Sequence, residues 1–66
     1  MEYREIRELV RIRHELRTLA ALRAADTARP LIDRMTSLAE RDPIESAAVQ
    51  TEVSRWRFVF RLEDGV

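Results

Sequence analysis

Apolar residues in the first part of the chain recur every three or four positions, which is the spacing of one face of an α-helix. Leu9, Ile12, Leu16 and Leu19 follow a 3-4-3 spacing, typical of a helix that packs along another helix. Arginine and glutamate occupy most of the opposite face, where they alternate at distances that favour weak ion pairs. The pattern predicts one long helix over about residues 2–25.

A proline interrupts this pattern at position 30 and predicts the start of a second, shorter helix. Asp26 or Thr27 can cap that helix, which would place Pro30 in the first turn, where proline is tolerated. The apolar spacing then continues to about Arg41, so the second helix is expected over residues 28–41. A kinked continuation of the first helix is the alternative.

The third helix is expected over residues 43–62, because Asp42, Pro43 and Glu45 form a capping sequence. Apolar and polar residues alternate over 56–62, which is also typical of a half-buried strand. A polar stripe at helical spacing favours the helix, and a lone terminal strand would have no partner in the chain. Residues 63–66 are expected to be a frayed tail, with Gly65 suited to stopping a helix.

These patterns predict an all-α fold, a three-helix unit of one long, one short and one medium helix in a single domain over residues 1–62. A 66-residue chain without cysteine has a small core and no disulfide, so association with another copy is the remaining source of stability. The third helix is apolar over most of its circumference, which predicts a dimeric helical bundle. The residues expected at a self- or partner-interface are Leu9, Ile12, Leu16, Leu19, Val53, Trp56 and Phe60.

The charge of the chain is balanced, with 12 arginines, no lysine and 12 acidic residues. This balance argues against a general binder of polyanions. Using arginine alone is typical of a chain encoded by GC-rich codons, and the whole chain shares this bias. No apolar run is long enough to span a bilayer, and the N-terminus lacks the apolar core of a signal peptide, so we expect a cytoplasmic protein without a membrane partner.

Two arginines, Arg13 and Arg55, fall inside the apolar arcs of their predicted helices. A buried guanidinium needs an acidic or hydrogen-bonding partner, and Glu52 or Asp33 is the expected acid. The alternative is an interior site for a small anion, or a minor enzyme, that Arg13, Arg17 and Arg55 would line.

A nucleic-acid-binding regulator is a further alternative, which would use the arginine-rich face of the first helix. Glu5, Glu8 and Glu15 interleave with these arginines and are expected to cancel much of their field. Taken together, the candidate contacts for an anion or a nucleic acid are Arg4, Arg7, Arg11, Arg13, Arg17 and Arg55.

Residues that could support catalysis are sparse. His14 is the only histidine and falls on the polar face of the first helix, there is no cysteine, and the one glycine, Gly65, cannot build a phosphate-binding loop. We therefore expect no enzyme activity, no metal and no cofactor. The function that the sequence favours is a small protein–protein interaction module, either a homodimer or an accessory, regulatory subunit of a larger partner.

Overall fold

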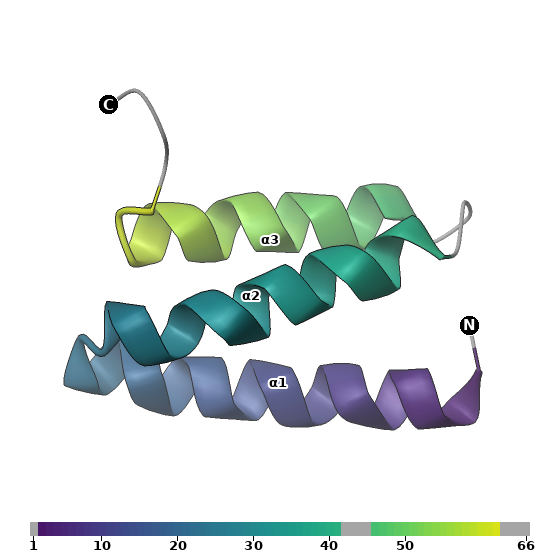
Figure 1. Ribbon diagram of the computed structural model, residues 1–66, viewed down its shortest axis with the longest axis horizontal. Helices are drawn as coiled ribbons and strands as arrows, with labels where there is room; N and C mark the ends of the chain where they lie inside the picture. Colours follow the sequence, from purple (N-terminus) through teal and green to yellow (C-terminus); the bar gives the residue numbers. More distant parts are fainter. Residues whose placement is uncertain (1, 42–45, 63–66) are drawn as a thin grey trace.

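The computed structural model describes residues 2–41 and 46–62 of the chain, and within these residues it contains three α-helices and no strand. The helices are α1 (Tyr3–Leu22), α2 (Ala25–Glu40) and α3 (Ser46–Val59). Helix α2 lies between the other two and runs in the opposite direction, so α1 and α3 are parallel (Figure 1). The expected all-α fold with three helices is confirmed.

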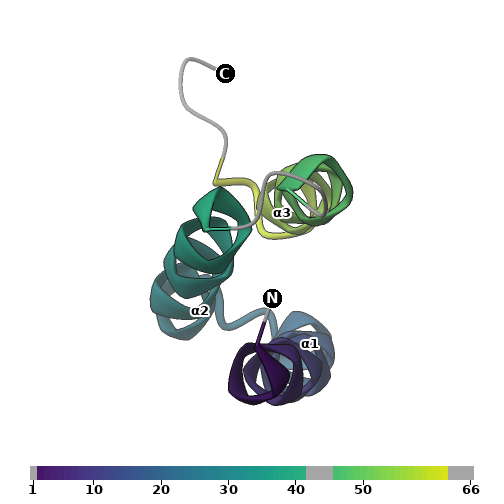
Figure 2. The same cartoon turned by 90° about the vertical axis from the view of Figure 1, so that its right-hand side faces the viewer.

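The three helices occupy the corners of a triangle when viewed along their length (Figure 2). Helix α2 packs closely against both α1 and α3, whereas α1 and α3 approach one another much more weakly. One side of the triangle is therefore less tightly closed than the other two, and we call it the α1–α3 side.

The core lies where α2 meets its two neighbours. From α1 it receives the apolar residues whose 3-4-3 spacing predicts a packing face, and α2 supplies its own apolar stripe. The buried apolar residues are Leu9, Ile12, Leu16, Ala28, Ile32, Met35, Leu38, Ala39, Val49, Val53 and Phe60. This cluster is continuous, and Trp56, Leu19 and Leu31 pack against its edge with part of their surface exposed. No side chain among the described residues is both charged and fully buried.

Helix α1 begins at a capping box, in which Glu2 and Glu5 accept hydrogen bonds from each other's backbone amides. It ends at Leu22, three residues before the predicted end, because Arg23 adopts a left-handed conformation with φ 55°. The amides of Arg23 and Ala24 then donate to the carbonyls of Ala20 and Leu19, a hydrogen-bond pattern that closes helices.

Helix α2 begins at Ala25, so the predicted start near residue 28 was wrong, as was a cap by Asp26 or Thr27. The early start places Pro30 inside the helix rather than in its first turn. A separate second helix is confirmed, because the turn at Arg23 breaks the chain direction and excludes a kinked continuation of α1.

Helix α3 includes Trp56 to Val59, so the strand alternative for residues 56–62 was wrong. The helix stops before the predicted end at Leu62, because Arg61 adopts a left-handed conformation with φ 57°. The amides of Arg61 and Leu62 donate to the carbonyls of Phe58 and Arg57. The predicted capping sequence at residues 42–45 and the tail at residues 63–66 lie outside the described residues.

Glycine at either left-handed position should stabilise the fold. A side chain with a Cβ atom is disfavoured in this conformation by about 1 kcal/mol, and glycine is not. We expect Arg23→Gly and Arg61→Gly each to raise the free energy of unfolding by about 0.5–1 kcal/mol, measured by urea denaturation. Arg57→Gly, inside α3, is the control and should lower it by about 1 kcal/mol. A loss of stability in both left-handed variants would contradict the assignment of these two helix ends.

Candidate interaction surfaces

The residues predicted to form an interface lie mostly in the core of the single chain. Leu9, Ile12, Leu16, Val53 and Phe60 are all buried. The two others of the predicted set, Leu19 and Trp56, are partly buried against the core. The fold of one chain thus accounts for the apolar character of the five buried positions, and any interface has to use side chains that remain exposed.

A polar cluster of Arg13, Glu52 and Trp56 joins α1 to α3. The Arg13 Nε donates to both carboxylate oxygens of Glu52, at 2.9 and 2.8 Å. The indole Nε1 of Trp56 donates to the Oε2 of Glu52 at 3.3 Å. The expected ion pair of Arg13 with an acid across the bundle is confirmed, and of the two candidate acids Glu52 is the one that the structure places there.

The environment of Glu52 favours its ionised form. Partial burial raises the pKa of the carboxyl, but the hydrogen bonds from Arg13 and Trp56 and the nearby charge of Arg55 together outweigh burial. The net effect is a pKa below the ordinary value. Folding therefore favours the ionised carboxylate of Glu52 over its protonated carboxylic acid.

Apolar side chains flank this cluster on the α1–α3 side. Ile6 and Val10 precede Arg13 by seven and three residues, so the helical repeat places them on the same side of α1. On α3, Val59 follows Glu52 by seven residues and lies on the side that faces α1. These three side chains are 46%, 58% and 48% exposed. The smaller Ala20 and Ala48 occupy equivalent positions of the two helices, so the α1–α3 side is an incompletely covered apolar strip around one ion pair.

The interior arginine cluster is not formed in the part of the chain that the structure describes. Arg13 is engaged with Glu52, while Arg17 and Arg55 are exposed to solvent. The expectation that Arg55 would lie in an apolar interior was wrong, because α3 turns that position towards the outside. All three arginines nevertheless border the α1–α3 side, since Arg17 follows Arg13, and Arg55 follows Glu52, by about one helical turn.

The opposite face of α1 carries the other predicted arginines. Arg4, Arg7 and Arg11 are exposed, and together with Glu8 they line a shallow depression of about 390 Å³. The guanidinium of Arg7 lies over the ring of Tyr3, with its carbon 5.8 Å from the ring centre. The structure thus brings these three arginines together on one surface of the first helix.

Arg34 of α2 and Arg41, which directly follows α2, add two arginines to this face that helical spacing did not identify. The Nη2 of Arg34 donates to the Oε1 of Glu8 at 2.9 Å, and the Nη1 of Arg41 donates to Glu5 at 3.4 Å. The hydrogen bond from Arg34 lowers the pKa of the Glu8 carboxyl, and the charges of Arg11 and Arg41 lower it further. The paired residues are 26 and 36 positions apart in sequence. Helical spacing relates only residues within one helix, so it could not predict either pair.

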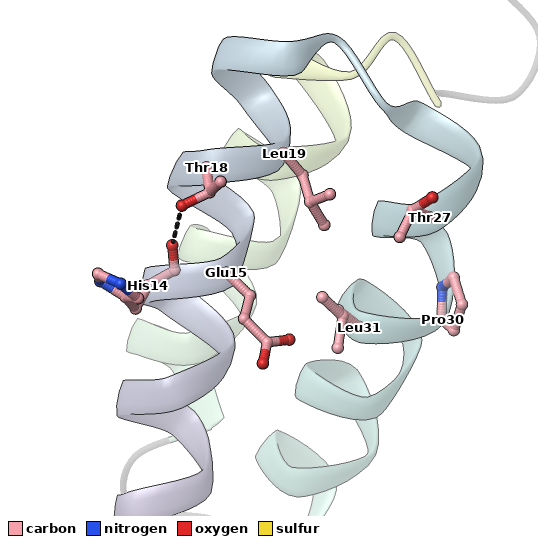
Figure 3. Close-up of a pocket in the computed structure, with 7 residues that line it drawn as sticks. All are labelled: His14, Glu15, Thr18, Leu19, Thr27, Pro30 and Leu31. Atoms are coloured by element: carbon pink, nitrogen blue, oxygen red, sulfur yellow. Dashed lines mark hydrogen bonds between the residues drawn. The ribbon is translucent and has the colours of Figure 1, made fainter.

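A second depression, a groove of about 360 Å³, lies between α1 and α2 (Figure 3). Its lining residues are His14, Glu15, Thr18, Leu19, Thr27, Pro30 and Leu31. Leu19 and Leu31 face each other across the groove, Glu15 extends towards α2, and His14 points away (Figure 3). His14 and Glu15 therefore diverge, and the groove does not bring an acid and a base together for catalysis.

Among the described residues, no three histidine, cysteine or acidic side chains come close enough to hold a metal ion. None of the described helices has the length and hydrophobicity needed to cross a membrane. The chain matches no protein-family model, and neither a curated protein nor a solved structure is significantly similar to it.

Proposed function

We propose that this protein is an interaction module that associates with a second copy of itself through the α1–α3 side. The observation that carries the proposal is the exposure of Ile6, Val10 and Val59 around the Arg13–Glu52 ion pair. Exposed aliphatic residues that cluster on one side of a fold are typical of a surface that binds another protein.

The weak packing between α1 and α3 supports this proposal. A second pair of helices that covers this side would complete a four-helix arrangement, in which each copy contributes α1 and α3. Such packing would bury Ile6, Val10, Ala48 and Val59, together with the exposed part of Trp56. At about 25 cal/mol per Å², aliphatic area of this kind supplies most of the favourable free energy of association.

A second copy is a suitable occupant because the chain has no net formal charge, so two copies do not repel one another at long range. A two-fold axis also brings the same apolar strip from both copies together, which is the commonest arrangement in homo-oligomers. A chain of 66 residues gains relatively more from such burial than a large domain does. Docking of a larger partner on the same side is the alternative.

The test is size-exclusion chromatography with light scattering on the wild-type protein and on Val10→Arg. We expect a wild-type dimer, and we expect the variant to dissociate with a Kd at least about 100-fold higher, because two added charges would face each other. Leu22→Arg is the matched control. Leu22 is 69% exposed on the same helix, but it follows Arg13 by nine residues and lies on the opposite face.

Circular dichroism should show that both variants keep the helix content of the wild type. A wild-type protein that stays monomeric at high concentration would reject self-association and leave the larger partner as the occupant. A dimer that survives Val10→Arg as well as it survives Leu22→Arg would show that copies associate through another face.

A further inference from the structure

The arginine-rich face of α1 carries more net positive charge at its surface than the sequence indicates. Along the helix, Glu5 and Glu8 alternate with arginines and should cancel them. In the folded chain, Arg34 of α2 pairs with Glu8, and Arg41, which directly follows α2, pairs with Glu5. Two of the three carboxylates that interleave with the arginines of α1, Glu5 and Glu8, are therefore neutralised by cations from outside α1, and the third, Glu15, lies one turn beyond Arg11.

The exposure of the paired groups also makes this surface more positive. The side chains of Glu5 and Glu8 are 15% and 23% exposed, whereas those of Arg41 and Arg34 are 63% and 46% exposed. Solvent, or a ligand, thus meets the guanidinium side of each pair more than the carboxylate side. We call this surface the arginine face. It carries three carboxylates, Glu5, Glu8 and Glu15, and five arginines, Arg4, Arg7, Arg11, Arg34 and Arg41.

Two acidic residues of α2 lie next to arginines in sequence but point away from the arginine face. Asp33 precedes Arg34 and Glu40 precedes Arg41, so the helical repeat turns each acid about 100° away from the arginine that follows it. The chain has no net charge, but its positive side chains are concentrated on one surface, where α1 meets the C-terminal half of α2.

The spacing of the arginines suits a chain of phosphates. Arg4 and Arg11 are seven residues apart, or about 10 Å along the helix at 1.5 Å per residue. Arg7 lies between them, so three guanidinium groups follow one line. Guanidinium groups bind phosphate oxygens in a bidentate manner and remain charged at any physiological pH.

Tyr3 supplies a feature that phosphate binding alone does not need. Its ring is 72% exposed at the start of the arginine face, and Arg7 lies over it. An exposed aromatic ring beside arginines is the arrangement by which proteins stack an unpaired base while holding the backbone. The described residues that line the depression on this face are Arg4, Arg7, Glu8 and Arg11, and none of these four is aliphatic. A protein partner would need an apolar anchor there.

We propose that the arginine face binds single-stranded nucleic acid, with Arg4, Arg7 and Arg11 on successive phosphates and Tyr3 stacked on a base. Arg34 and Arg41 neutralise Glu8 and Glu5 and add to the positive potential. The helical repeat places Arg4 and Arg11 on the side of α1 opposite Arg13. Binding is therefore independent of the α1–α3 side, and a dimer would carry two arginine faces.

The experiment measures fluorescence anisotropy of a labelled single strand of about 15 nucleotides, as DNA and as RNA, at several salt concentrations. We expect binding at low salt whose logarithmic salt dependence has a slope of about −2 to −3, the value for three or four phosphate contacts on a single strand. The triple variant Arg4→Gln, Arg7→Gln, Arg11→Gln should bind at least about 10-fold more weakly and lose most of this slope.

The matched control is the triple variant Arg29→Gln, Arg57→Gln, Arg61→Gln, which removes the same charge from three other exposed positions. It should keep binding within about 3-fold of the wild type if the site is local. Tyr3→Leu should weaken binding more than Tyr3→Phe does, because phenylalanine keeps the stacking ring.

Several outcomes would overturn the proposal. These are no binding at low salt, equal losses in the two triple variants, or equal affinity for a duplex of the same length. Polyglutamate that binds as tightly as the nucleic acid would show that the face recognises acidic protein. Failure of the dimer in light scattering would leave these results unaffected, so the two proposals fail separately.

Discussion

Replacing Leu16 with alanine should lower the free energy of unfolding by about 3–5 kcal/mol, which is the cost of an unfilled cavity in a closely packed core. Leu16 is 0% exposed and belongs to the cluster that includes Ile32, Met35 and Leu38. A domain of this length has a total stability of about 3–10 kcal/mol. The variant is therefore expected to be partly or wholly unfolded at room temperature, as urea denaturation followed by circular dichroism would show.

Leu22→Ala is the control for this prediction, since it makes the same chemical change on the same helix. Leu22 is 69% exposed, so the expected change is within about 0.5 kcal/mol. If Leu16→Ala cannot be measured because it unfolds, Ile12→Val provides a smaller step of about 1 kcal/mol in the same core. Similar effects at Leu16 and Leu22 would mean that α1 does not bury the face assigned to it.

The packing face of α1 could be predicted from sequence because its pattern is local and long. Leu9, Ile12 and Leu16 repeat over two turns, and only one side of a helix can contain them all. The third helix was harder to assign, since aromatic and aliphatic residues alternate near its end. Packing against α2 decides which side of α3 faces the core. It buries Val49 and Val53 and leaves Phe58 71% exposed.

The helix ends could not be predicted with the same accuracy. Sequence rules look for glycine at the left-handed position that stops a helix, and here arginine occupies that position twice, at Arg23 and Arg61. At both positions, backbone amides donate to carbonyls of the last helical turn and close the helix without glycine. The start of α2 was misplaced for a related reason, because α1 ended early and Ala24 took the capping position from Asp26.

The candidate surfaces were predicted only in part. Helical spacing identified Arg4, Arg7 and Arg11 as one face and gave Arg13 an acidic partner across the bundle. It could not identify the pairs of Glu8 with Arg34 and Glu5 with Arg41, since those contacts depend on how two helices are placed side by side.

The Arg13–Glu52–Trp56 cluster should contribute measurably to stability, because it is the polar connection between α1 and α3. We expect Glu52→Gln to lower the free energy of unfolding by about 1–2 kcal/mol. Hydrogen bonds to a charged group contribute about 1.5–3 kcal/mol, and the 39% exposure of the Arg13 side chain reduces this value. Glutamine keeps the shape of the side chain, so the change reports mainly on charge. Glu40→Gln, at an exposed position of α2, should change stability by less than about 0.5 kcal/mol.

The effect of Glu52→Gln should also depend on pH. The pKa of Glu52 is lower in the folded chain than the ordinary value of 4.5, so the folded state holds fewer protons than the unfolded state around that pH. Its stabilising contribution is complete above pH 4.5 and is lost as the pH falls through the lowered pKa. Wild type and Glu52→Gln should therefore differ most near neutral pH and converge in acid. The carboxyl of Glu8, whose pKa is also lowered, titrates in both proteins and cancels from the comparison. A difference that stays constant from neutral pH to about pH 3 would show that the folded chain does not select the carboxylate form of Glu52.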